Sequence, residues 1–319
     1  MRDFQCPNCG QRLAFENSQC LRCLSAVGID PAVGDFALAG FRCANAELAA
    51  CNWLVPVAGQ LCRSCRLTRT RPDDDDLDAL REFAQAEKAK RRLVFELDAL
   101  RLPVRGRAED PEQGLAFDLL SSRGTPVTTG HADGVITLDL AESDDVHREQ
   151  LRISMDEPYR TLLGHFRHEI GHYYFTVLVG DLDREDFTAL FGDPDLDYQA
   201  AIDRHYAEGA PSGWGEEYVS AYATMHPAED WAETFAHYLH IRDSLDTAAA
   251  FAFAPAGVAI GSVPASGIGF ERVIEVWLPL AWSLNMLNRS MGQDDLYPFV
   301  LSPPVLEKLR YVHRLVQRR

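Results

Sequence analysis

The stretch His168-Glu169-Ile170-Gly171-His172 decides how the rest of this sequence is interpreted. On a helix, its two histidines lie on one face, about 6 Å apart along the axis. Both imidazoles can then bind one metal ion, with the Glu169 carboxylate beside them. The apolar residues around the motif recur at helical spacing: Leu162, Leu163, Phe166, Ile170, Tyr173, Tyr174 and Val177. The sequence therefore predicts a zinc-binding helix from Pro158 to about Val179.

A catalytic zinc needs a third protein ligand, and the residues after the motif restrict the choice. The extended motif HExxHxxGxxH requires Gly at 175 and His at 178, but the chain has Phe175 and Leu178 there. Better candidates are Glu229 and Glu233, which share one face of a helix predicted from Ser220 to about His240. One acid can bind zinc while the other accepts the free N–H of a ligating histidine. Periodicity alone does not say which acid has which role.

The two segments together resemble the gluzincins, the zincin peptidases whose third zinc ligand is a glutamate. In that class a helix carrying ExxxD or ExxAE follows HExxH, and the first acid reaches the metal. The resemblance implies that the catalytic zinc is held by His168, His172 and Glu229. It also implies that Glu233 lies behind one of the histidines.

Tyr222, seven residues before Glu229, is similar in position to a tyrosine of the lethal-factor branch of the gluzincins. The resemblance implies that Tyr222 stabilises the oxyanion. Zinc-activated water would then attack a peptide carbonyl, with Glu169 as the general base that later protonates the leaving amine. His237 is a second candidate donor to the oxyanion. We expect Gly134–Leu140 to be an edge strand on which an extended peptide substrate pairs.

All eight cysteines lie before residue 66. The first cysteine set consists of two CxxC pairs: Cys6, Cys9, Cys20 and Cys23. The second cysteine set has one CxxC pair and a less regular spacing: Cys43, Cys51, Cys62 and Cys65. Four thiolates close the coordination of a zinc ion and leave no position for substrate. We therefore predict two structural zinc ions beside the catalytic one.

The apolar spacing along the rest of the sequence predicts an α+β protein with more helix than strand. A double zinc-ribbon region (1–71) is followed by an acidic linker and a connecting helix (72–101, helical over 77–100). A zincin-like, mostly helical metallopeptidase domain (102–319) follows. Within it we expect short strands over 115–120 and 134–140 and further helices over 273–287 and 304–317. We expect the Ala- and Gly-rich segment 247–270 to be a loop.

The net charge of −17 argues against nucleic acid or an anionic membrane as the main partner. Residues 1–71 carry eight Arg and five acids, a balance of +3, so the rest of the chain sums to −20. No apolar stretch precedes the first cysteines, so we expect no secretory signal, a cytoplasmic location and reduced thiols.

The order of zinc ribbon and HExxH domain resembles the bacterial family described as "putative zinc-binding metallopeptidase". This resemblance implies a zinc peptidase acting on a peptide or protein substrate. The alternative is a zinc-stabilised binding or regulatory protein whose HExxH domain does little chemistry. Its ribbon would dock on a protein or, less favoured by the net charge of −17, on nucleic acid. The +3 balance of the ribbon region permits that alternative. The presence of the full His, Glu and Tyr set in one chain favours the enzyme.

Overall fold

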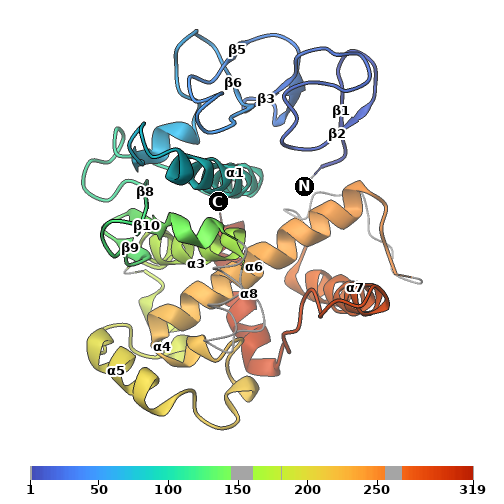
Figure 1. Cartoon of the computed structure of the whole chain (residues 1–319). Coiled ribbons are helices and arrows are strands. Elements are labelled where there is room, and N and C mark those ends of the chain that lie inside the picture. The colour runs from blue at the N-terminus through green and yellow to red at the C-terminus, as the bar shows by residue number, and fades with distance from the viewer. Residues whose placement is uncertain (1, 145–160, 181, 256–267, 319) are drawn as a thin grey trace. The chain divides into compact units, whose positions relative to one another are not determined.

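The computed structural model describes residues 2–144, 161–180, 182–255 and 268–318 (Figure 1). They belong to two compact units, residues 1–166 and 167–319, and helix α3 (Leu162–Tyr174) has residues in both. The fold contains more helix than strand and has cysteine-rich loops at its N-terminal end. The predicted α+β class is therefore confirmed.

The cysteine-rich part of the first unit is built from very short antiparallel strand pairs. They are β1 (Phe4–Gln5) with β2 (Arg12–Leu13), β3 (Gly28–Asp30) with β4 (Asp35–Ala37), and β5 (Phe41–Arg42) with β6 (Leu54–Val55). Strands of two or three residues supply few ladder hydrogen bonds and little apolar area. Such a segment needs additional links to stay folded.

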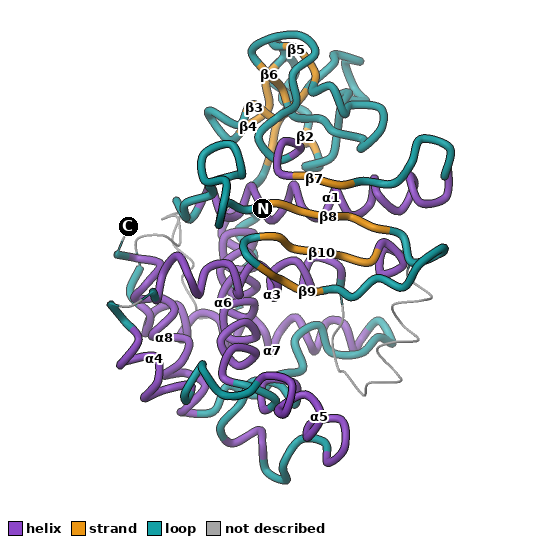
Figure 2. The backbone as a smooth tube through the Cα atoms, turned by 90° about the vertical axis from the view of Figure 1, so that its left-hand side faces the viewer, coloured by secondary structure: helices purple, strands orange, loops and turns teal. Residues whose placement is uncertain are grey.

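A four-stranded sheet follows in the same unit, in the order β7-β8-β10-β9 (Figure 2). Its strands are β7 (Thr68–Thr70), β8 (Ala116–Leu120), β9 (Gly130–Ala132) and β10 (Val135–Asp139). The two strands predicted here are both present, and they pair in parallel. The expectation that 134–140 forms an edge strand was wrong, because β10 pairs with β8 on one side and with β9 on the other.

Helix α1 (Leu77–Ala99) begins where Asp76 accepts a hydrogen bond from the Ala79 backbone N–H. One part of the helix packs on the cysteine-rich region, where the Phe95 ring lies 5.1 Å from that of Phe15. Another part packs on the sheet, where Lys90 Nζ lies 5.3 Å from the centre of the Phe117 ring. The helix is therefore buried on more than one face.

The second unit is helical. Besides the end of α3 it contains α4 (Arg184–Phe191), α5 (Tyr198–Glu208), α6 (Pro227–Ala250), α7 (Phe270–Ser290) and α8 (Pro303–Gln317). Helix α6 contacts α4, α7 and α8 and is the centre of the unit (Figure 1). Its Trp231 is fully buried, and five aromatic rings lie within 6.3 Å of it: Phe175, Phe187, Phe191, Phe235 and Tyr311.

The helices predicted in this unit are present with shifted starts, and α7 begins at Phe270 rather than at residue 273. Helix α6 begins at Pro227 rather than at residue 220, because proline fits the first helical turn and His226 caps it. Helices α4 and α5 were not predicted. The loop predicted over 247–270 is helical at both ends, and its residues 256–267 lie outside the described part, as do residues 158–160 of the predicted zinc-binding helix.

Within the described ranges, none of the helices combines the length and the apolarity needed to cross a lipid bilayer.

Candidate metal centres

Helix α3 places the two histidines of the motif on one face, as its spacing predicts. The Nε2 atoms of His168 and His172 lie 3.3 Å apart, and the ring planes are inclined by 78°. Two imidazole nitrogens this close point at a common position. After Tyr174 the helix widens into a π-helical turn over Phe175–Val179, a distortion that is frequent at functional sites.

Gly171, inside the motif, lets helix α6 approach α3 closely. A Cβ at this position would lie 2.9 Å from the Ala232 Cα and 3.1 Å from the Ala232 carbonyl oxygen. The indole Nε1–H of Trp231 donates to the Gly171 carbonyl oxygen at 2.8 Å. The two helices are therefore held together at the turn that carries the histidines.

This approach brings the first acid of α6 to the imidazoles. Glu229 is 1% exposed, and its Oε2 lies 3.0 Å from His168 Nε2, while its Oε1 lies 3.4 Å from His172 Nε2. Ligand atoms of these three residues all lie within 4.8 Å of one another. The group contains two nitrogen donors and one carboxylate, the donor set typical of a catalytic zinc.

The second acid lies one turn further along α6 and reaches the other face of the imidazole. Glu233 Oε1 lies 2.7 Å from His168 Nδ1. A carboxylate at this distance accepts the Nδ1–H and leaves Nε2 free for a metal. The geometry therefore gives the two acids different roles, with Glu229 facing the ring nitrogens that converge and Glu233 behind one of them.

The electrostatics of the group fit a cation. Burial disfavours a charged His168, but its contacts with the accepting carboxylates of Glu229 and Glu233 outweigh the effect of burial and raise the pKa of His168 well above its usual value. Burial likewise opposes ionisation of Glu229, yet the two histidines hold the pKa of this carboxyl well below its usual range. A proton and a metal ion compete for such a nitrogen, so a site that attracts the proton strongly also attracts the metal.

Two buried oxygens in this group support the fit of a metal. Glu169 Oε2 is buried and has no hydrogen-bond partner among the described residues, and the buried Glu229 Oε2 has none besides its 3.0 Å contact with His168 Nε2. A buried carboxylate oxygen without a partner is costly. A zinc ion on Glu229 and a water beside Glu169 would satisfy both atoms.

Tyr222 lies in a 3₁₀ turn (Tyr222–Thr224) before α6, with its ring centre 5.9 Å from that of His168. Burial, followed by the charge of Glu229, raises its pKa above the ordinary value, so the hydroxyl keeps its proton. The other candidate donor, His237, is buried, and its Nδ1 lies 2.8 Å from the Tyr297 hydroxyl.

Sequence reasoning missed one residue of this site. The Tyr198 hydroxyl, on helix α5, donates to Glu229 Oε1 at 2.9 Å. Tyr198 lies in the long stretch between the motif and Glu229, and no spacing pattern connects it to either. Only the three-dimensional structure shows that Tyr198 contacts Glu229.

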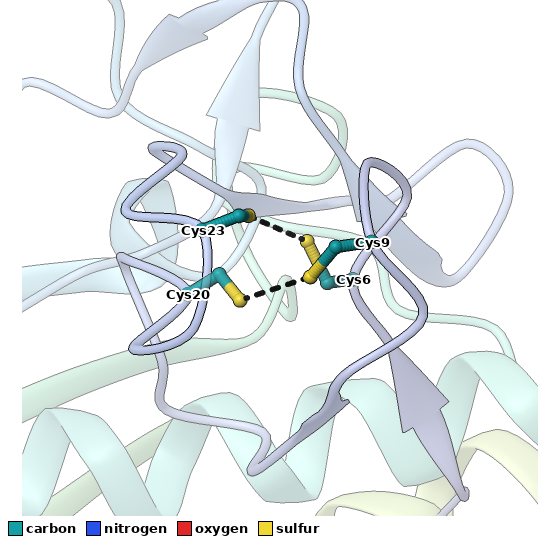
Figure 3. Close-up of side chains that lie close together, drawn as sticks. All are labelled: Cys6, Cys9, Cys20 and Cys23. Atoms are coloured by element: carbon teal, nitrogen blue, oxygen red, sulfur yellow. Dashed lines mark hydrogen bonds between the residues drawn. The ribbon is translucent and has the colours of Figure 1, made fainter.

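The first cysteine set brings its two CxxC loops face to face (Figure 3). The sulfur atoms of Cys6 and Cys23 lie 3.7 Å apart, as do those of Cys9 and Cys20. Four sulfurs at about 2.3 Å from one zinc ion in a tetrahedron would lie about 3.8 Å apart. The spacing therefore fits a zinc ion, and all eight cysteines of the chain carry free thiols.

The second cysteine set is buried and has the same spacing, with 3.7 Å between the sulfurs of Cys51 and Cys62. The backbone N–H of Cys62 donates to the sulfur of Cys43 at 3.2 Å, a bond that favours the thiolate.

Helix α1 places Arg91 near the second cysteine set, where its guanidinium donates to the Ala50 carbonyl oxygen at 3.2 Å. Lys90 pairs with Glu87 at 2.5 Å, and Glu87 Oε2 also lies 3.8 Å from the Cys65 sulfur. The two cations are therefore shared with this carboxylate and offset only part of the charge that four thiolates would carry.

Comparison with known proteins identifies the family. A sequence model described as "Putative zinc-binding metallo-peptidase" matches residues 79–315, well over half of the chain. The chain belongs to this family. A zinc-ribbon domain model matches twice, over residues 3–40 and 33–76, so this zinc-binding metallopeptidase family member also carries the ribbon region that the cysteine spacing predicted.

Relatives with the same organisation occur in mycobacteria. The uncharacterized proteins Mb2598c of Mycobacterium bovis and Rv2568c of Mycobacterium tuberculosis are each 61% identical to this metallopeptidase family member over 329 residues. The alignment covers 99% of this chain and 95% of each relative. No solved structure matches the chain.

Proposed function

We propose that the protein is a zinc-dependent peptidase of the gluzincin type. The observation that carries the proposal is the convergence of His168 Nε2, His172 Nε2 and the buried Glu229 carboxylate. Membership of the zinc-binding metallopeptidase family supports it. Two further zinc ions on the cysteine sets would bring the total to three.

His168, His172 and Glu229 would hold the catalytic ion. When bound, zinc supplies a Lewis acid that polarises a peptide carbonyl and makes water easier to deprotonate. Glu233 fixes the tautomer of His168 by accepting its Nδ1–H, which directs the Nε2 lone pair to the metal.

Glu169 is the general base in this proposal. Its Oε2 is buried and free of hydrogen bonds within the described part of the chain, so it can accept a proton from the attacking water. A C–O bond forms as that water attacks the carbonyl carbon. The C–N bond then breaks, and the same proton passes from Glu169 to the leaving amine. The Tyr222 hydroxyl remains protonated and can donate to the oxyanion.

The test is hydrolysis of a mixed peptide library, with and without a zinc chelator. Glu169→Gln should keep its zinc and its fold but lose activity by at least about 100-fold, since the amide cannot accept the proton. Glu185→Gln, an exposed acid on α4, is the matched control and should behave like the parent.

Equal turnover by Glu169→Gln and the parent would exclude Glu169 as the base. A protein that binds three zinc ions and cleaves nothing in the library would favour the alternative, a zinc-stabilised binding protein that uses its ribbon to dock on a protein partner. A cytoplasmic location, in which the free thiols stay reduced, remains part of the prediction.

A further inference from the structure

Tyr198 contacts the carboxylate that faces the metal-binding histidines. Its hydroxyl donates to Glu229 Oε1 at 2.9 Å, while Oε2 of the same carboxylate lies 3.0 Å from His168 Nε2. A carboxylate held at one oxygen cannot rotate freely about its Cγ–Cδ bond. The hydrogen bond from Tyr198 therefore keeps Oε2 directed at His168.

Tyr198 is placed by contacts at the start of both α5 and α6. Asp197 caps α5 by accepting from the Ala200 N–H at 3.0 Å, which fixes Tyr198 in the first turn. The Leu196 carbonyl oxygen lies 3.1 Å from His226 Nε2, and the other nitrogen of that ring accepts from the Ala228 N–H at 3.1 Å.

His226 is 4% exposed, so the histidine end of this bridge is buried. Its ring centre lies 5.2 Å from that of Tyr198. His226 thus ties the start of α5, which carries Tyr198, to the helical turn that carries Glu229.

We infer that Tyr198 is a positioning residue of the metal centre, which holds the ligand Glu229 as Glu233 holds the ligand His168. Both histidine and carboxylate ligands commonly depend on such outer partners, and loss of one typically weakens metal binding by about 10- to 100-fold. The inference rests on the metal site of the proposed function. It does not depend on peptide hydrolysis.

The experiment measures zinc affinity by competition with a chelator in the full-length protein. Tyr198→Phe keeps the ring and removes only the hydroxyl, so we expect the third zinc to bind about 10- to 100-fold more weakly. Tyr206→Phe is the matched control, because Tyr206 lies on the same helix and is 71% exposed. It should bind zinc like the parent, and both variants should keep the zinc of the cysteine sets.

Tyr198→Ala separates hydrogen bonding from ring packing. If Tyr198→Phe binds zinc like the parent and only Tyr198→Ala is weakened, the hydroxyl has no positioning role and the inference is overturned. If the parent binds no third zinc, both the inference and the proposed function fail. If zinc binds as expected but no peptide is cleaved, only the proposed function fails.

Discussion

Replacing Gly171 by alanine tests whether the close approach of α3 and α6 builds the proposed catalytic metal site. The added Cβ would lie 2.9 Å from the Ala232 Cα, where ordinary carbon contacts are about 3.5–4.0 Å. The obstacle is backbone, which cannot turn aside as a long side chain can. The helices must therefore separate by roughly 0.6 Å or more at this point.

Two opposing effects set how much Gly171→Ala changes the free energy of unfolding. Overpacking of this kind costs about 1–3 kcal/mol, while replacing glycine by alanine inside a helix gains about 1 kcal/mol. Separation also stretches the 2.8 Å hydrogen bond from the Trp231 indole to the Gly171 carbonyl. We therefore expect a net loss of about 1–2 kcal/mol in the free energy of unfolding.

Zinc binding at the His-His-Glu site should be affected more strongly by Gly171→Ala than the free energy of unfolding is. Glu229 lies one turn before Ala232, so it moves away from the histidines together with the helix. A misplacement approaching 1 Å can cost about 100-fold at a precisely arranged site, and we expect zinc binding weaker by about 10- to 100-fold.

The assay combines denaturant unfolding of the protein, with the zinc of the cysteine sets retained, with chelator competition for the zinc of the His-His-Glu site. Gly215→Ala is the control, because a Cβ there has no neighbour within 4 Å. The reasoning is refuted if Gly171→Ala is as stable as the parent, or more stable, and binds zinc with unchanged affinity.

Three further outcomes are expected. Elemental analysis should find three zinc ions per chain, and His168→Ala should lower the count to two; an unchanged count would rule out the His-His-Glu site. Glu229→Ala should lose the catalytic zinc outright, while Glu233→Ala should keep it with affinity weakened by about 10- to 100-fold, and metal titration showing the reverse would exchange their roles. Burial, followed by the charge of Arg242, lowers the pKa of His313 from 6.5 to about 4. Between pH 6.5 and about 4, His313 therefore binds a proton in the unfolded chain but stays neutral in the folded chain. The free energy of unfolding should fall as the pH drops through this range. Thermal melts across this range should show a smaller fall for His313→Gln, and an identical fall would exclude His313 as the source.

The sequence predicted the parts of the fold whose signals are local. The helix of the motif and the acid pair Glu229 and Glu233 follow from a spacing of four residues. Helix α5 was missed because Ala201 alone among its residues is buried, so its apolar residues show no helical period. Helix α4 likewise buries only Phe187 and Phe191.

The parts that depend on pairing between distant segments could not be predicted. Strand β10 was taken for an edge strand because nothing in 134–140 shows that 130–132 pairs beside it. The contact between Tyr198 and Glu229 joins residues 31 positions apart across two helices. Such contacts follow from how helices close on one another, which no short-range pattern encodes.

The pairing of β7 with β8 imposes an order on synthesis. Arg69 Nε on β7 donates to Asp118 Oδ1 on β8 at 2.9 Å, and these residues are 49 positions apart. At a synthesis rate of about 5–20 residues per second, β7 leaves the ribosome about 2.5–10 s before its partner strand β8. Strand β7 begins three residues after Cys65, so metal loading of the second cysteine set can anchor its start during that interval. The zinc available to the nascent chain, and not only to the finished protein, would then govern how much of the protein matures.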